Sequence, residues 1–182
     1  MIIYALRHGI TEMNKKGILN GPIDEPLAPE GIKQAEKTIQ FVPKSVRYVY
    51  SSPLTRAAHT AKILGEALSL PVAIEPGLSE IDLGALSGKS WAQMPSGKEL
   101  KELHRTLKFD YQAHGGESLD QVIGRVKGAI ATINQKHKDG EVLIVAHGGV
   151  IRVLRFLSSD SITHEPIDNA QIITLNSTKI LA

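Results

Sequence analysis

The feature that most constrains this sequence is an alternation of short apolar runs with longer segments of helical period. Five runs are expected to be strands: Ile2 to Leu6, Val46 to Ser51, Val72 to Ile74, Val142 to Ala146 and Gln171 to Asn176. The first and fourth are almost continuously apolar, which is typical of strands covered on both faces. Helical period is expected in four segments: Pro29 to Phe41, Leu54 to Leu68, Ser118 to His137 and Gly148 to Leu157. Strands that alternate with helices indicate an α/β fold, a three-layer α/β/α sandwich with a mainly parallel central sheet.

Residues 1–182 are expected to form a single domain. Their number is typical of one domain, and no internal repeat or low-complexity tract divides them. Residues 86–117 interrupt the rhythm of strands and helices with glycines, a proline and several lysines, and contain one plausible helix. We expect this segment to be an excursion over one edge of the domain, a cap over a site.

Composition and charge exclude several classes of function. The chain has no cysteine, so thiol nucleophiles, disulfides and cysteine-based zinc sites are excluded. The net charge is +2, and no Lys/Arg block indicates nucleic-acid binding. No stretch approaches the length of a membrane span, and the first apolar run is too short for a signal peptide. We therefore expect a cytoplasmic protein without membrane contact; the oligomeric state is left open.

Residues suited to phosphoryl chemistry follow four of the expected strands, where ligands bind in open α/β sheets. They are Arg7, His8, Thr11 and Asn14 after the first strand, Arg56 after the second, Glu80 and Asp82 after the third, and His147, Gly148 and Gly149 after the fourth. Each has an ordinary alternative, as a turn histidine, a surface arginine, a solvated acid or a glycine that permits a tight turn. Their joint occurrence at strand ends favours a single site for an anion.

These residue types form a chemically coherent set. A neutral imidazole can attack phosphorus covalently, and two arginines with a second histidine can hold the phosphoryl oxygens. Backbone amides at a helix start after Gly148 add donors for an anion. A carboxylic acid can protonate the leaving oxygen and then deprotonate the hydrolytic water. No metal or other cofactor is required, and no carboxylate cage for Mg²⁺ is visible.

The sequence resembles the histidine phosphatase superfamily, in its phosphoglycerate mutase-like branch. The shared motifs run in family order over about residues 1 to 153: "RHG", "NGPIDEPLAPEGIKQA", "SSPLTRAAHTA", "LSEIDLG", "GGES" and "VAHGG". The resemblance implies that His8 is the phosphorylated nucleophile and that Glu80 is the general acid, with Asp82 a second candidate.

The resemblance also implies roles for the surrounding residues. The expected phosphate pocket consists of Arg7, Arg56 and His147, with further substrate or phosphate contacts from Thr11, Asn14 and Gly148. The resemblance gives structural roles to Gly31, Ser51 and Thr60.

Three features favour hydrolysis over mutase chemistry. The chain is short, so little material shields a phosphohistidine from water. Glu80 to Gly84 lacks the arginine and tyrosine that help mutases bind substrate, and Gly149 stands where mutases commonly have asparagine. We therefore expect a metal-independent phosphomonoesterase for a small phosphorylated metabolite, closest in pattern to α-ribazole phosphatase-like enzymes. The alternatives are a cofactor-dependent phosphoglycerate mutase and a non-catalytic phosphate- or phosphohistidine-binding module.

Substrate identity is left open by the sequence. Leu86 to Gly88 and Pro22 depart from the family pattern at positions near the substrate rather than the transferred phosphate. We expect residues 10–26 and 86–117 to set specificity.

Overall fold

A five-stranded sheet forms the centre of the protein. The structure is a computed structural model that describes residues 1–138, 140–159, 161 and 165–182. Its strands are β1 (Ile2–Arg7), β2 (Tyr48–Ser51), β3 (Val72–Ile74), β4 (Glu141–Ala146) and β5 (Ile172–Asn176), in the order β3-β2-β4-β1-β5. Neighbours among β1 to β4 run parallel, whereas β5 pairs antiparallel with β1 at one edge. The sheet is thus mainly parallel, as predicted.

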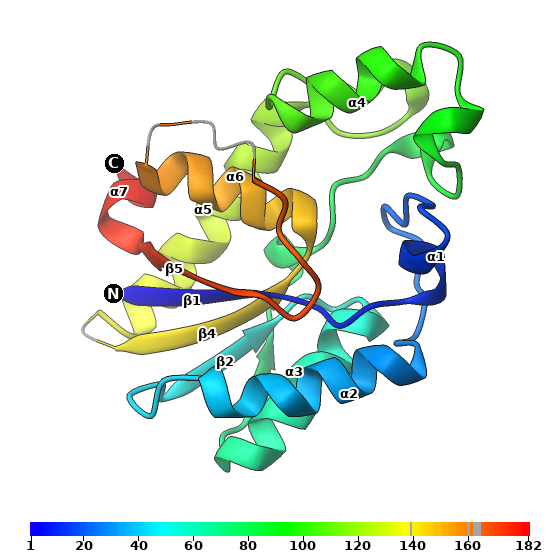
Figure 1. Cartoon of the computed structure of the whole chain (residues 1–182). Helices are drawn as coiled ribbons and strands as arrows, with labels where there is room; N and C mark the ends of the chain where they lie inside the picture. The colour runs from blue at the N-terminus through cyan, green and yellow to red at the C-terminus, as the bar shows by residue number, and fades with distance from the viewer. Residues whose placement is uncertain (139, 160, 162–164) are drawn as a thin grey trace.

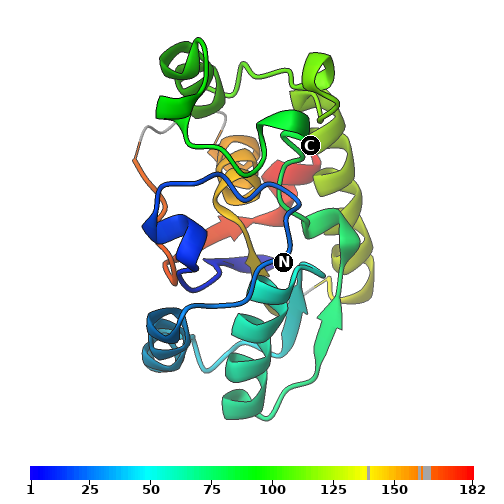
Figure 2. The same ribbon diagram turned by 90° about the vertical axis from the view of Figure 1, so that its right-hand side faces the viewer.

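Helices cover both faces of this sheet (Figure 1), and the turned view in Figure 2 shows the same layers. The α-helices are α1 (Glu12–Lys15), α2 (Pro29–Thr38), α3 (Thr55–Leu68), α4 (Gly97–Arg105), α5 (Leu119–Lys136), α6 (Gly148–Ser159) and α7 (Ser177–Leu181). The 3₁₀ helices are η1 (Ile39–Phe41), η2 (Pro76–Leu78), η3 (Gly84–Leu86), η4 (Trp91–Gln93) and η5 (Gln112–His114). α2 and α3 lie on one face, and α5, α6 and α7 lie on the other. The three-layer α/β/α sandwich is therefore confirmed.

The alternation of side chains along β4 builds a separate apolar core on each face. Leu143 and Val145 pack with residues of α3, whereas Val142 and Ile144 pack with residues of α5 and α6. Successive side chains of a strand point to opposite faces, so a strand buried on both faces must be apolar throughout. This explains the continuous apolar run in the sequence.

The predicted element boundaries need small corrections. Each strand lies within two residues of its predicted bounds. The helix expected over Pro29 to Phe41 is α-helical only to Thr38, and its last turn tightens into η1, which is common at helix ends. Ser118 caps α5 as expected, and its hydroxyl accepts a hydrogen bond from the backbone N–H of Gln121.

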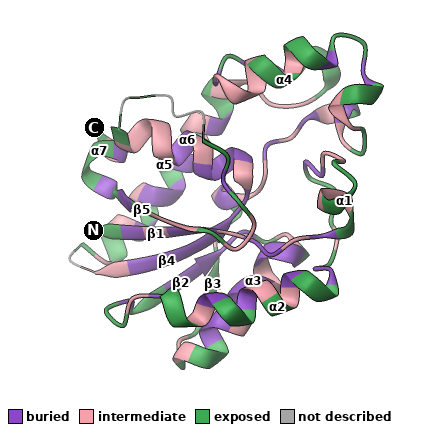
Figure 3. Cartoon of the chain, in the orientation of Figure 1, coloured by how far each residue is buried: buried purple, intermediate pink, exposed green. Residues whose placement is uncertain are grey.

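Residues 86–117 stand apart from the strand–helix layers. They contain α4 between the short helices η4 and η5 (Figure 1), and much of α4 is exposed or half-buried (Figure 3). The segment has a small aromatic core, in which His104 stacks on Phe109 and Phe109 stacks on the fully buried Tyr111. Within the described residues, no helix is long and apolar enough to cross a membrane.

Candidate active site

His8 follows directly after β1, at the carboxyl end of the sheet. Its backbone N–H donates to the carbonyl of Ala146 at 3.0 Å, which ties it to the end of β4. The residue is only 3% exposed, and its Nδ1 lies 2.7 Å from the carbonyl oxygen of Gly9. Because a carbonyl oxygen can only accept, Nδ1 carries the proton and Nε2 keeps its lone pair. His8 thus has the free ring nitrogen that a nucleophile needs.

Close backbone packing holds the His8 loop in place. A Cβ on Gly9 would lie 2.3 Å from the carbonyl oxygen of Gly31, and a Cβ on Gly31 would lie 2.2 Å from that of Ile10. Any side chain at either position would push the loop away from α2. The Gly9 N–H also donates to the Thr60 hydroxyl at 3.1 Å. Gly31 and Thr60 therefore position the loop that carries His8.

The guanidinium groups of Arg7 and Arg56 both lie near His8. Arg56 is fully buried in the first turn of α3 and donates to two backbone carbonyls of the loop before α2, at 2.8 and 2.9 Å. Arg7 ends β1 and donates to the carbonyl of Ile167 at 2.6 Å. The Nε of each is buried and has no hydrogen-bond partner in the described part of the chain. The backbone thus fixes both side chains and leaves one donor of each free.

His147 lies beside His8, with 5.1 Å between the two ring centroids. It is fully buried, and its Nε2 lies 2.7 Å from the hydroxyl oxygen of Ser52. Its Nδ1 is buried without a partner among the described residues. With the two arginine Nε atoms, this makes three unpartnered buried nitrogens around one histidine.

Burial and the nearby cations keep both histidines neutral. Burial, Arg56 and Arg7 lower the pKa of His8 from 6.5 to about 3, against a smaller raising effect of the Gly9 carbonyl. Burial, then His8 and Arg56, lower the pKa of His147 well below its ordinary value. Burial also lowers the pKa of Arg7 and of Arg56, but arginine stays protonated in proteins. Two neutral rings beside two cations make a site that favours an anion.

A cavity of about 450 Å³ opens at this point. Of the residues predicted from the sequence, those that line it are Arg7, His8, Asn14, Arg56, Glu80, Gly148 and Gly149. His147 is adjacent to His8 but does not line the cavity. Thr11 is buried at the N-cap of α1, where its hydroxyl accepts from the Asn14 N–H at 3.2 Å. The structure therefore places Thr11 beneath Asn14 rather than at the cavity wall.

Glu80 and Asp82 differ in where their carboxylates point. Glu80 lines the cavity and accepts hydrogen bonds from the Ile81 N–H at 2.9 Å and the Gly149 N–H at 3.4 Å. A Cβ on Gly149 would lie 2.6 Å from Glu80 Oε1, so only glycine leaves room for the acid in this position. The Asp82 carboxylate instead accepts from the Gly84 N–H at 2.8 Å and does not line the cavity. The structure thus brings Glu80, not Asp82, to the cavity that His8 lines.

The loop that carries Glu80 is braced by an ion pair between Arg125 and Glu117, at 2.6 Å. Arg125 donates to three backbone carbonyls within residues 77–80, at 2.7 to 3.2 Å. Glu117 also accepts from the backbone N–H of Asp82 at 2.9 Å. Burial acts to raise the pKa of Glu117, but Arg125 and the Asp82 N–H outweigh it and hold the pKa below its ordinary value.

Sequence reasoning missed several residues of the site. Ser52 and Arg152 lie inside motifs that were noted for other residues. The four-residue spacing from Gly148 to Arg152 places these two residues on one face of α6. Asn169 had no such signal, since it lies in an irregular segment. It donates to the His8 carbonyl at 2.9 Å and to the Asn14 side chain at 3.2 Å.

The arrangement of these residues defines a class of protein. A neutral histidine, one buried and one half-buried guanidinium and a carboxylate line one cavity at the carboxyl ends of parallel strands, which is an anion site suited to phosphoryl transfer. Within residues 1–138, 140–159, 161 and 165–182, no three His, Cys, Asp or Glu side chains gather as a metal site.

Residues 3–179 match the family model of the histidine phosphatase superfamily (branch 1). The chain therefore belongs to this superfamily, which confirms the resemblance found in its motifs.

Three similar proteins are informative. The chain is 36% identical over 160 residues to a metal-independent phosphoserine phosphatase of Arabidopsis thaliana, a match that covers 84% of the chain and 66% of that protein, just under two thirds. It is 30% identical over 182 residues to a putative phosphoserine phosphatase 2 of Hydrogenobacter thermophilus, covering 96% and 88%. A mycobacterial glucosyl-3-phosphoglycerate phosphatase, solved with VO3, superposes with a TM-score of 0.86 at 27% identity, covering 96% and 90%.

Proposed function

We propose that the protein is a metal-independent phosphomonoesterase that acts through a phosphohistidine at His8 on a small phosphorylated metabolite. One observation carries the proposal. Four buried side-chain polar atoms of the described residues lack a hydrogen-bond partner. Three of them are nitrogens of Arg7, Arg56 and His147, which surround His8, and the fourth is the Ser87 hydroxyl. Buried donors are normally paired, so three free ones at one point indicate a ligand with several acceptor oxygens.

The geometry supports a two-step mechanism. Nε2 of His8 attacks phosphorus while the bond from phosphorus to the ester oxygen breaks, and Glu80 gives its proton to the departing oxygen. Glu80 then takes a proton from a water whose oxygen attacks the phosphohistidine, which frees His8 and releases inorganic phosphate. Each step conserves charge and protons, and Glu80 ends as it began.

The surrounding donors stabilise the charge that shifts between the phosphoryl oxygens. Arg7 and Arg56 can each direct a free N–H toward them, as can His147 in the tautomer in which Nε2 accepts from the Ser52 hydroxyl and Nδ1 carries the proton. The start of α6 at Gly148 adds backbone donors. Asn14 lines the same wall, and its side chain is oriented by Asn20 and Asn169, at 2.8 and 3.2 Å.

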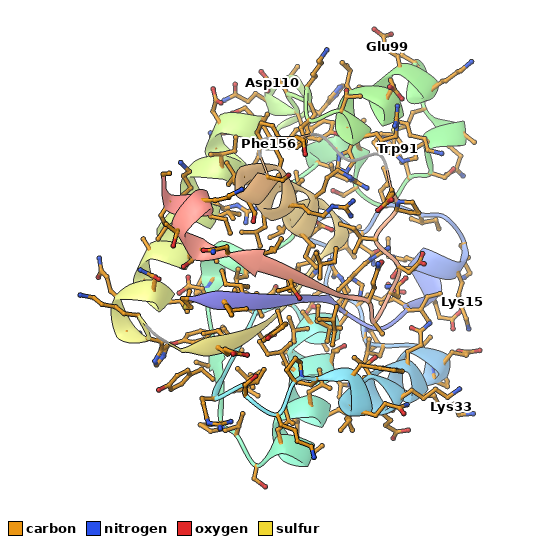
Figure 4. The ribbon with its side chains drawn as sticks, turned by 60° about the vertical axis from the view of Figure 1, so that its left-hand side comes forward. Lys15, Lys33, Trp91, Glu99, Asp110 and Phe156 are labelled. Carbon is orange, nitrogen blue, oxygen red and sulfur yellow. The ribbon has the colours of Figure 1, made fainter. Side chains whose placement is uncertain are left out.

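The names of the relatives support hydrolysis of small phosphorylated compounds, among them phosphoserine and phosphoglycerate derivatives. An α-ribazole phosphate-like substrate stays a prediction, as does a cytoplasmic location. Residues Trp91, Lys101 and His104 line the cavity from the excursion, which supports its expected role as a cap. Figure 4 shows Trp91 on the inner side of this segment, while Glu99 projects from its outer side.

The proposal is tested by phosphate release from a panel of phosphorylated metabolites, with EDTA present throughout. The panel includes phosphoserine, 3-phosphoglycerate and α-ribazole phosphate. His8→Ala is the test variant, and His59→Ala is its matched control, because His59 lies on α3 outside the cavity lining. We expect EDTA-resistant release that disappears in His8→Ala and persists in His59→Ala. Release that survives in His8→Ala, or exchange of phosphate between glycerate phosphates without net release, would contradict the proposal.

A further inference from the structure

The end of the cavity under the excursion holds cations that chemistry at phosphorus does not use. Arg152 of α6 and Lys101 of α4 both line it, together with Trp91 and His104. Arg152 lies one helical turn beyond Gly148, on the same face of α6. The same face of α6 therefore carries both the backbone amides proposed to bind phosphate and the side chain of Arg152.

Arg152 is half-buried, and no described residue gives it a hydrogen-bond acceptor or an ion-pair partner. Burial lowers its pKa, Glu80 acts in the opposite direction, and Arg155 and Arg105 lower it further. A partly desolvated guanidinium whose five donors have no protein acceptor retains its full capacity to bind an anion. An anionic group on the substrate would supply the missing acceptors.

The charges around the cavity point to the same conclusion. Four cations of the described residues line it, Arg7, Arg56, Lys101 and Arg152, against one carboxylate, Glu80. A phosphate monoester brings close to two negative charges at neutral pH. At least one positive charge then stays unbalanced: one with Glu80 ionised, and two when Glu80 carries the proton that it gives to the leaving oxygen.

The remaining residues at this end are neutral and well fixed. His104 Nδ1 lies 2.9 Å from the hydroxyl of Tyr111, and burial and Arg152 lower the pKa of His104 from 6.5 to about 3. The Trp91 ring lies beside it, with 5.8 Å between the centroids. Neither residue supplies a charge, so recognition of an anion here falls to Arg152 and Lys101.

We propose that Arg152, assisted by Lys101, binds a carboxylate on the organic part of the substrate. The preferred substrates are then small phosphomonoesters that carry one further negative charge. A carboxylate suits Arg152, because the planar guanidinium can pair with two carboxylate oxygens at once. This inference rests on the proposed phosphatase function and assigns it a substrate class.

Two esters that differ only at the proposed contact provide the test. 3-Phosphoglycerate carries a carboxylate where glycerol 3-phosphate carries a hydroxymethyl group. The quantity to measure is the ratio of their kcat/KM values in wild type, Arg152→Met, Arg152→Lys and Lys101→Gln. Matched controls are Arg155→Met, on the same helix, and Lys98→Gln, on α4; neither residue lines the cavity.

We expect wild type to prefer the carboxylate ester and Arg152→Met to lower the ratio roughly tenfold or more, as for other hydrogen bonds to charged groups. Arg152→Lys should retain part of the preference, and Lys101→Gln should lower the ratio less, because Lys101 is exposed. The two controls should keep the wild-type ratio. An unchanged ratio in Arg152→Met, or an equal loss on both esters, would overturn the proposal.

Calorimetric binding of both esters to the His8→Ala protein separates this inference from the proposed function. A preference for 3-phosphoglycerate that Arg152→Met abolishes in that background supports the subsite even if wild type hydrolyses neither ester. Hydrolysis by wild type without any such preference in binding or turnover would retain the phosphatase and reject the subsite.

Discussion

The ion pair between Arg125 and Glu117 offers a quantitative test of how the acid loop is held. Replacing Arg125 with leucine leaves Glu117 without its cation, and three carbonyls within residues 77–80 without their donor. Breaking a buried ion pair costs about 3–5 kcal/mol. The two side chains are 22% and 21% exposed, so screening reduces this figure, and we expect a loss of about 2–3 kcal/mol.

The assay is denaturant unfolding of wild type, Arg125→Leu and the matched control Arg105→Leu. Arg105 forms an ion pair with Glu102 at 2.7 Å, but those side chains are 37% and 56% exposed. Exposed pairs contribute about 0–1 kcal/mol, so the control should lose little. Equal losses of stability in the two variants would refute the claim that the Arg125–Glu117 pair stabilises the protein because it is largely shielded from water.

The same pair gives the effect a pH dependence with a defined sign. The pKa of Glu117 in the folded protein lies below its ordinary value of 4.5. The stabilisation is therefore complete above about pH 4.5 and is lost as the pH falls through the folded-state value. The stability gap between wild type and Arg125→Leu should narrow in acid; a gap that widens would contradict this assignment.

Three further predictions concern the chemical step. Glu80→Gln should slow esters with poor leaving groups far more than activated aryl phosphates, because only the former need a proton; equal losses on a leaving-group series would move the acid role elsewhere. Gly149→Ala should produce the same selective loss, since its Cβ would lie 2.6 Å from Glu80 Oε1, and a wild-type leaving-group dependence would count against this contact. With the pKa of His8 lowered to about 3, His8 is already deprotonated at pH 6.5, so the pH profile of kcat/KM should show no step near that pH from this residue. A group that titrates near pH 6.5 in ligand binding by wild type, and is missing in His8→Ala, would contradict the buried, neutral ring.

The sequence predicted the fold because its strong signals are local and periodic. The continuous apolar run of β4 is typical of a strand buried on both faces, and the apolar stripe of α5 is typical of a helix that packs on one face of a sheet. The end of α2 was less predictable, because Ile39 to Phe41 keep an apolar pattern while the backbone tightens to a 3₁₀ turn.

The site could be predicted as far as its residues follow the strands. Parallel strands bring their carboxyl ends together, so His8, Arg56, Glu80 and His147 had to meet. The difference between Glu80 and Asp82 depends on the Asp82 carboxylate binding the Gly84 N–H, which no spacing reveals. Asn169 reaches His8 from an irregular segment without periodicity and had no signal at all.

Cavity residues from the excursion were the hardest to anticipate. Lys101 and Trp91 follow no strand, and their approach to the site depends on how α4 and η4 fold back over the domain. Arg152 was within reach of the sequence, since its spacing from Gly148 is that of one helical turn.

In the proposed mechanism His8 becomes phosphorylated during turnover. The most direct measurement is mass spectrometry of the protein quenched within milliseconds of mixing with its best substrate, under conditions that preserve phosphohistidine. We predict one phosphoryl group, located on the His8 peptide and absent from His8→Ala. Phosphate release at the full rate with no phosphoryl group on His8, or with one on another residue, would contradict it.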